Sequence, residues 1–331
     1  DELDAKPLPF LLANPMSESE ISALNPTDVL VEYKWDGIRA QLIKTHETIR
    51  LWSRGDQDIT EQFPDIVEVA TTLPSQIILD GEILAGTTEH LQTFNDLQTR
   101  LNRKRITRTL LKTHPAFFKA YDLLRLAGED LRGHPLIARK AALSKIAVSQ
   151  SLTMHPMCSE SIHAMRQEAR GKGAEGVMIK GKQSCYVGGR KAGHWWKWKL
   201  DPMTADCVLI YAQAGHGRRA SLYSDYTLAC WDQDNELVPV AKAYSGLTDA
   251  ELKDMDQWIR KHTLQKFGPV RQVEAFHVFE IGFEGIARST RHKSGIALRF
   301  PRILRWRQDV GPKDADHLTH FEALMSGSHA V

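Results

Sequence analysis

The sequence has few cysteines, no long apolar run and almost no net charge. Its four cysteines, Cys158, Cys185, Cys207 and Cys230, form no C-x-x-C pair, which disfavours a zinc ribbon or a thioredoxin-like site. No apolar run approaches the ~18 residues of a membrane helix, and no signal peptide is visible. Lys and Arg number 43 against 41 Asp and Glu, so the net charge of +2 excludes a polycation or an acidic tail protein. These absences favour a globular cytoplasmic protein with buried, reduced cysteines and no membrane segment.

The residues before Asp201–Pro202 mix short strands with helices. Apolar residues at helical spacing predict helices over Pro135–Val148 and Ser159–Arg170. The β-rich runs, which are separated by turn-forming residues, are Val29–Lys44, Ile49–Trp52, Ile77–Leu84, Phe117–Leu126, Val177–Lys180 and His194–Leu200. We therefore expect an α+β domain over residues 1–201, and the length of 331 residues agrees with two domains.

Strands dominate the residues after this boundary. One helix interrupts them, and a T-x-x-E capping box at Thr248 and Glu251 marks its start. The β-rich runs are Ala205–Ala212, Ser221–Trp231, Val238–Tyr244, Ala275–Glu284 and Ala297–Trp306. Five strands and one helix in ~130 residues predict a small β-barrel of the OB type over residues 202–331, although a six-stranded or sandwich arrangement would give nearly the same pattern.

Lys34 stands in the segment E-Y-K-W-D-G-I-R, residues 32–39. In an extended segment alternate side chains share a face, so Lys34 lies with Glu32 and Asp36 while Tyr33 and Trp35 point the other way. A lysine between carboxylates and aromatics, just before a glycine turn, is not typical of a lysine that simply faces solvent. The octapeptide alone fits a salt-bridge cluster on an edge strand equally well.

Two further segments place carboxylates in β-rich surroundings. Asp80 and Glu82 interrupt an apolar run, where a buried charge needs a cation or a metal as its partner; the alternative is an Asp-Gly hairpin turn. Residues 171–176 match G-x-G-x-x-G, but the match follows a helix and leads into a strand, the reverse of a dinucleotide-binding fingerprint. Glu175 and Lys180 remain notable at the two ends of that strand.

The segment H-W-W-K-W-K, residues 194–199, is the densest signal. Alternation places Lys197 and Lys199 on one face of a strand and Trp196 and Trp198 on the other. Two ammonium groups side by side above an aromatic face predict an anion site, most naturally for phosphate. The alternative is a half-buried strand whose lysines extend along apolar surface into solvent.

Two basic stretches contain no intervening acid. They consist of Arg100, Arg103, Lys104, Arg105, Arg108 and Lys112, and of Arg288, Arg291, Lys293, Arg299, Arg302, Arg305 and Arg307. Such a run is usually a solvated face. Arginines on a predicted barrel nevertheless suit the phosphates of a nucleic-acid backbone.

Taken in order, these segments resemble the nucleotidyltransferase motifs of ATP-dependent DNA ligases, most closely the larger bacterial type. Residues 34–39 resemble the nucleophile motif K-x-D-G-x-R, and 299–302 with 305–309 resemble the C-terminal motif of the family. The intermediate motifs resemble residues 53–55, 80–82, 121–124, 175–180 and 196–199. The resemblance implies an α+β nucleotidyltransferase domain, with ATP-grasp-like antiparallel sheets and helices, followed by an OB-fold barrel.

The resemblance also implies roles for the residues that match the motifs. Lys34 is implied as the adenylylated nucleophile, Glu32 as the residue that recognises adenine, and Tyr121 as the ring that stacks on adenine, where phenylalanine is commoner in the family. Arg39 and Arg54 are implied as ligands of phosphate and ribose groups.

The remaining implied roles concern metal and phosphate. Glu82 is implied to bind ribose or a metal, and Glu175 a metal, with Mg²⁺ or Mn²⁺ as the ion. Lys180, Lys197 and Lys199 are implied to bind the α-phosphate of ATP. The residues expected to contact DNA or pyrophosphate are Arg103, Lys104, Arg105, Arg299, Arg302, Arg305, Arg307 and Asp309.

The implied activity is the sealing of nicks in duplex DNA through a lysyl-AMP intermediate. AMP passes to the 5′-phosphate, and the 3′-hydroxyl then displaces it. The C-terminal arginines are expected to act when the barrel closes over the nucleotide. We expect a monomer that lacks the helical DNA-binding domain found upstream in the larger ligases.

Rival interpretations remain open. An RNA ligase or a capping-type nucleotidyltransferase would use the same scaffold, and a non-catalytic OB-type module would explain the basic stretches alone. An NAD⁺-dependent ligase is disfavoured because the four-cysteine zinc element of that family has no counterpart here.

Overall fold

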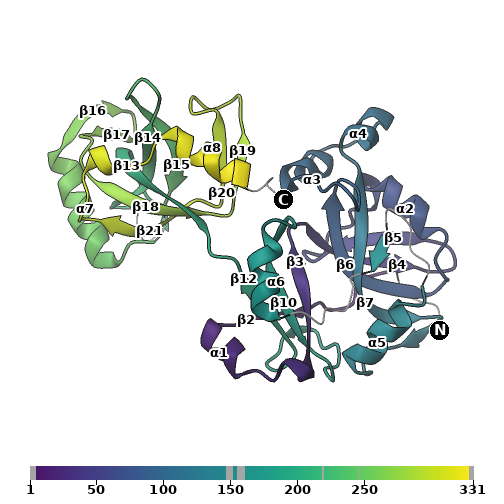
Figure 1. The fold of residues 1–331 in the computed structure, drawn as a ribbon. Helices are drawn as coiled ribbons and strands as arrows, with labels where there is room; N and C mark the ends of the chain where they lie inside the picture. Colours follow the sequence, from purple (N-terminus) through teal and green to yellow (C-terminus); the bar gives the residue numbers. More distant parts are fainter. Residues whose placement is uncertain (1–4, 147–151, 155–160, 218–219, 245, 328–331) are drawn as a thin grey trace. The chain divides into compact units, whose positions relative to one another are not determined.

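The computed structural model describes residues 5–146, 152–154, 161–217, 220–244 and 246–327 (Figure 1). The chain forms two compact units, Asp1–Leu200 and Asp201–Val331. Within the described residues, no helix is both long enough and apolar enough to cross a membrane.

Two β-sheets form the centre of the first unit. The larger sheet has the order β5-β4-β6-β7-β8, with β9 beside β7, and the smaller sheet has the order β2-β12-β10-β3. The strands of the larger sheet are β4 (Ile38–Lys44), β5 (Ile49–Ser53), β6 (Ile77–Ala85), β7 (Ala116–Leu126), β8 (Glu129–Asp130) and β9 (Leu152–Met154). Those of the smaller sheet are β2 (Asn14–Pro15), β3 (Val29–Trp35), β10 (Ala174–Gly181) and β12 (Trp195–Lys199), and β1 (Leu11–Leu12) pairs separately with β11 (Gly189–Arg190).

Successive side chains of a strand point to opposite faces of its sheet, and both faces of each sheet carry buried apolar side chains. The facing sides of the two sheets share one cluster, in which Ile43, Ile78 and Leu124 of the larger sheet pack with Trp195 of the smaller. The opposite sides pack against helices. These helices are α1 (Glu18–Ala23) and α6 (Ile162–Ala169) on the smaller sheet, and α2 (Pro64–Ala70), α3 (Phe94–Leu101) and α5 (Leu136–Leu143) on the larger.

The turn at Asp36–Gly37 carries the chain from one sheet to the other. β3, which ends at Trp35, belongs to the smaller sheet, and β4, which begins at Ile38, belongs to the larger. A Cβ atom on Gly37 would lie 2.2 Å from the carbonyl oxygen of Ile83, so only glycine fits this close approach. The turn therefore fixes the ends of β3 and β4 at the edge where the two sheets converge.

The second unit has the strand connectivity of an OB barrel. β13 pairs with β14 and β18, β14 pairs with β15, β18 pairs with β21, and β15 contacts β20 and β21, which closes the barrel. The strands are β13 (Met203–Ala214), β14 (Tyr223–Trp231), β15 (Leu237–Ala243), β16 (Thr263–Phe267), β17 (Val270–Val273), β18 (Val278–Phe283), β19 (Gly285–Arg288), β20 (Ile296–Arg299) and β21 (Arg302–Arg307). The helices are α7 (Asp249–Lys261), which has the expected capping box, and α8 (Leu318–Gly327).

The elements differ from the sequence expectations in several places. The run Val29–Lys44 is two strands, because the glycine turn divides it, and the run Ala297–Trp306 is divided at Phe300, whose φ of 50° is incompatible with a strand. The hairpin of β16 and β17 and the helix α8 were not expected. The far end of Pro135–Val148 and the start of Ser159–Arg170 lie outside the described residues.

The cysteines only partly match their expectation. Cys207 and Cys230 are buried on neighbouring strands of the barrel, where their thiols share a hydrogen bond at 3.2 Å and form no disulfide. Cys185 is half-buried and donates a hydrogen bond to the Gly133 carbonyl at 3.3 Å. Cys158 lies outside the described residues.

His277 should make the stability of the second unit depend on pH. Its ring packs against Trp258, Phe276 and Trp306, and burial, with a smaller repulsion by His262, lowers its pKa to about 4. Because an unfolded histidine has a pKa near 6.5, the unfolded state binds more protons between those two values, and the stability rises with pH across this window.

We expect His277→Phe to remove part of this pH dependence. Urea unfolding at about pH 5 and about pH 7 would measure it, since both values bracket the titration of an unfolded histidine. The wild type should lose more stability at the lower pH than the variant does. Equal losses in the two proteins would contradict the prediction.

Candidate active site

Lys34 lies near the end of β3, beside Glu175 of the neighbouring strand β10. The Lys34 ammonium donates to one carboxylate oxygen of Glu175, and both side chains are 22% exposed. The other Glu175 oxygen lies 4.0 Å from the ammonium of Lys199 on β12. Lys34 is therefore open to solvent while its charge is balanced by a carboxylate.

A group of cations surrounds this lysine. Burial lowers the pKa of Lys197, and repulsion from Lys34 and Lys199, with smaller contributions from Arg190 and Arg54, lowers it further. Neighbouring positive groups repel one another, and a bound anion would offset this repulsion and favour their charged forms. The expected pairing of Lys197 and Lys199 on one face of the strand is therefore found, and this face suits phosphate.

Arg39 on β4 is held rigidly against the larger sheet. Its Nε and Nη2 donate to the Asp80 carboxylate at 3.2 and 2.7 Å, and its Nη1 donates to the Leu11 carbonyl at 2.6 Å. The Tyr186 hydroxyl donates to the same carboxylate at 2.7 Å. Asp80 thus has the cation partner that its apolar surroundings required, and the hairpin alternative is wrong because β6 runs through Gly81 without a turn.

Glu82 follows Asp80 on the same face of β6. Burial raises the pKa of Glu82 to about 8; Lys34 and Arg39 oppose this shift, while Asp80 and Glu175 add to it. A further cation near Glu82 would favour the ionised form of its carboxyl group and offset the repulsion from Asp80 and Glu175.

Glu82 and Glu175 are suited to a divalent metal that arrives with a phosphate ligand. No cluster of three or more His, Cys, Asp or Glu side chains able to hold a metal ion occurs in the described part of the chain. Mg²⁺ commonly uses only one or two carboxylates and completes its shell with water and substrate phosphate oxygens. Two interacting carboxylates beside this group of cations fit this mode.

Glu32 is the centre of a buried ion-pair group behind Lys34. Its carboxylate accepts a hydrogen bond from Lys180 on β10 at 2.6 Å and forms an ion pair with Lys140 on α5, and each of the three side chains is at most 2% exposed. The Lys180 ammonium also lies 4.3 Å from the ring centre of Tyr121 and 4.1 Å from that of Trp195. Burial lowers the pKa of Lys180, and Glu32 opposes that shift.

Lys140 and Lys119 were missed by sequence analysis. Lys119 on β7 lies opposite Glu82 of β6, and its ammonium lies 4.2 Å from the ring centre of Trp35. Neither lysine belongs to a motif, and each reaches the site from an element more than 80 residues after Lys34. Only the pairing of distant elements brings them there.

The first basic stretch is divided by burial. Arg103, Lys104 and Arg105 are exposed in the loop between α3 and α4 (Arg108–Thr113), as expected for residues that face a polyanion. Arg100 instead is fully buried and donates to both oxygens of Asp65 at 2.7 Å. Its charge stabilises the fold and is removed from the basic surface.

The C-terminal basic residues belong to the second unit and are partly balanced by carboxylates. Arg302 lies 3.1 Å from Glu284, and Arg305 lies 3.3 Å from Glu280. Arg307 donates to both oxygens of Asp309 at 2.9 Å, which lowers the pKa of Asp309 to about 2. The Arg299 guanidinium lies 5.1 Å from the ring centre of Phe300, which is 66% exposed.

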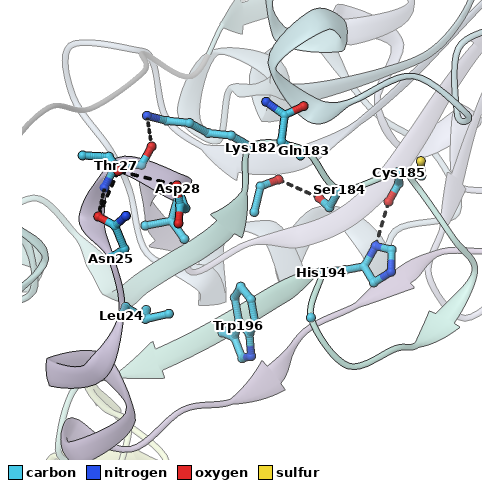
Figure 2. Close-up of a pocket in the computed structure, with 13 residues that line it drawn as sticks. Leu24, Asn25, Thr27, Asp28, Lys182, Gln183, Ser184, Cys185, His194 and Trp196 are labelled. Carbon is cyan, nitrogen blue, oxygen red and sulfur yellow. Dashed lines mark hydrogen bonds between the residues drawn. The ribbon is translucent and has the colours of Figure 1, made fainter.

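A separate pocket of about 630 Å³ lies on the other side of the smaller sheet. The loop before β3, the loop after β10 and the start of β12 line it, and Figure 2 shows Trp196 and His194 within it. Trp196 points away from the face that carries Lys197, because adjacent residues of a strand face opposite ways. The pocket is therefore distinct from the cation group around Lys34.

Comparison with known proteins identifies the family. Residues 10–199 match the model of the ATP dependent DNA ligase domain, and residues 219–310 match that of the ATP dependent DNA ligase C terminal region. A probable DNA ligase of Koribacter versatilis (strain Ellin345) is 35% identical over 346 residues, which cover 96% of this chain and 60% of that protein. A DNA ligase of Methanothrix thermoacetophila (strain DSM 6194 / JCM 14653 / NBRC 101360 / PT) is 33% identical over 319 residues, covering 95% and 58%. The chain thus spans about 60% of the length of these relatives.

Solved structures of the same fold agree. The ligase domain from M. tuberculosis LigD is similar at a TM-score of 0.51 and 23% identity, over 93% of this chain and 97% of that one. A Lig E DNA ligase structure is similar at a TM-score of 0.62 and 18% identity, over 90% and 99%. The expected fold, an α+β nucleotidyltransferase domain followed by an OB barrel, is confirmed. The chain belongs to the ATP-dependent DNA ligase family.

Proposed function

We propose that this chain is the catalytic core of an enzyme that seals nicks in duplex DNA with ATP. The observation that carries the proposal is the placement of Lys34. Its amine is reachable, contacts Glu175 and lies within a group of cations that suits a phosphate.

The first step joins Lys34 to AMP. The Lys34 ammonium, which is partly exposed beside Glu175, gives up a proton to water, and the free amine is the nucleophile. The amine then attacks the α-phosphorus of ATP, and the bond from this phosphorus to the bridging oxygen breaks as pyrophosphate leaves. Lys197, Lys199 and Arg54 would offset the negative charge on the phosphate oxygens of ATP.

The base and sugar of ATP would bind between the two sheets. Tyr121, which is half-buried, would offer its ring to the base, and the buried Glu32 would offer acceptor atoms. Arg39 is fixed by Asp80, so it would act as a rigid donor towards ribose or phosphate. Lys180 has N–H donors beyond the one that contacts Glu32, and these would reach the α-phosphate.

Glu82 and Glu175 would hold Mg²⁺ or Mn²⁺. When bound, such an ion would neutralise phosphate oxygens that the lysines leave uncompensated. The raised pKa of Glu82 supports this assignment, because a nearby cation would favour its ionised form.

The substrate of the later steps would be nicked duplex DNA, bound by a monomer. AMP moves from Lys34 to the 5′-phosphate, the 3′-hydroxyl attacks that phosphorus, and AMP leaves as the strand closes. The exposed cations Arg103, Lys104 and Arg105 suit backbone phosphates. The second unit would contribute Arg299, Arg302, Arg305, Arg307 and Asp309 to DNA or pyrophosphate.

Intact mass measurement tests the proposal. After incubation with ATP and Mg²⁺ or Mn²⁺, the protein should gain the mass of one AMP, and the adenylylated protein should seal nicked DNA faster than nicked RNA. The same measurement with GTP in place of ATP tests the rival interpretation, because a capping-type enzyme would gain the mass of GMP. No mass gain with either metal would contradict the proposal and leave a non-catalytic binding module.

A further inference from the structure

Lys140 reaches the site from a helix and belongs to none of the motifs. The neighbouring Arg139 anchors α5 on the larger sheet, because it donates to both oxygens of Asp122 at 2.8 and 3.0 Å. This anchoring directs Lys140 to Glu32 on β3 of the smaller sheet, and the Lys140 side chain is only 2% exposed. One carboxylate oxygen of Glu32 thus faces Lys140 and the other faces Lys180.

Charge balance alone does not require Lys140. One ammonium, that of Lys180, already neutralises Glu32, and burial of a second ammonium costs free energy of desolvation. Two cations, one at each oxygen, restrain the orientation of the Glu32 carboxylate more than one cation does. They fix the plane of the carboxylate and hold it ionised between the two sheets.

An ionised carboxylate accepts hydrogen bonds and donates none. A purine with an amino group at C6, such as adenine, presents a donor to it. A purine with a carbonyl at C6, such as guanine, presents an oxygen that repels it. A fixed, ionised carboxylate therefore discriminates between these purines, and a mobile or protonated one discriminates less.

We propose that Lys140 is a positioning residue that sets the purine specificity of the nucleotide site by holding Glu32 ionised and oriented. The inference rests on the proposed function, in which Glu32 faces the base of ATP. Lys140 itself acts through Glu32 and touches no reacting atom.

Four single variants and one double variant test this role. The changes are Lys140→Met, Lys140→Gln, Lys140→Arg, Glu32→Gln and the combination of Glu32→Gln with Lys140→Met. Formation of the nucleotidyl-protein from ATP and from GTP is followed by intact mass, and KM and the maximal rate are separated for each. Circular dichroism and thermal melting report folding.

Lys140→Met and Lys140→Gln should lower the preference for ATP over GTP by about tenfold, as expected when the hydrogen bond from the purine amino group to the Glu32 carboxylate is lost. KM for ATP should rise while the maximal rate changes little. Lys140→Arg should retain the preference, because its cation can replace the ammonium. In the Glu32→Gln background, Lys140→Met should change the preference no further.

An unchanged ATP preference and KM in a folded Lys140→Met or Lys140→Gln variant would overturn the inference and leave only a stabilising role. Failure of one variant to fold leaves the other to decide. Failure of the proposed function is distinguishable, since the wild type itself would then form no nucleotidyl-protein.

Discussion

Replacement of Lys34 by arginine is expected to abolish the covalent attachment of AMP. A guanidinium keeps the positive charge that faces Glu175, but it stays protonated at every accessible pH and offers no nucleophilic amine. The ion pair survives while the chemistry is lost. Intact mass after incubation with ATP and Mg²⁺ should show no AMP on Lys34→Arg, and the melting temperature should remain close to that of the wild type.

The control for this variant is Lys112→Arg, which lies on the exposed face of α4 and belongs to none of the motifs. It should gain AMP at the wild-type rate. Attachment of AMP to Lys34→Arg at that rate would show that another lysine is the nucleophile, and peptide mapping would then locate it.

The largest loss of stability is expected from Arg139→Met. Arg139 and Asp122 are both fully buried, and Arg139 also donates to the His134 carbonyl at 2.6 Å and the Ser184 carbonyl at 3.0 Å. Removing the guanidinium leaves a buried carboxylate without its cation, which typically costs about 3–5 kcal/mol. For a unit of this size the melting temperature of the first unit should fall by roughly 10 °C.

Arg132 provides a matched control in the same unit. It pairs with Asp130 at 2.7 Å, as close as a buried pair, but the two side chains are 33% and 39% exposed. Exposed pairs contribute about 0–1 kcal/mol, so Arg132→Met should hardly change the melting temperature. Equal losses in the two variants would show that burial does not decide the value of these ion pairs.

Patterns that are local in the sequence were predictable. Alternation over residues 194–199 predicts that Lys197 and Lys199 share a face, and β12 has this arrangement. The T-x-x-E box predicts the start of α7, and hydrogen bonds between Thr248 and Glu251 cap the helix there. In these cases the geometry of a single element determines the outcome.

Features that depend on the pairing of distant elements were not predictable. Arg100 reads as part of a basic surface, yet Asp65, 35 residues earlier, draws it into the core. Glu32 reads as a site residue with no visible partner, and its partner Lys140 follows 108 residues later on a helix. No spacing rule within one element gives either contact, because the register between elements decides both.

The two sheets of the first unit also differ in how far apart their strands lie in the chain. The strands β4 to β8 of the larger sheet are consecutive in the chain and end at Asp130. In the smaller sheet, β3 pairs with β10, which pairs with β12, and β12 ends only at Lys199. During synthesis the larger sheet can form first, since contacts between nearby segments form sooner than distant ones. Its apolar face, with Ile43 and Ile78, is covered only in part, by Leu11, until Trp195 is synthesised. Nascent chains stalled before this point should therefore expose apolar surface of the larger sheet. The ability to bind nucleotide should appear only at the end of translation of this unit.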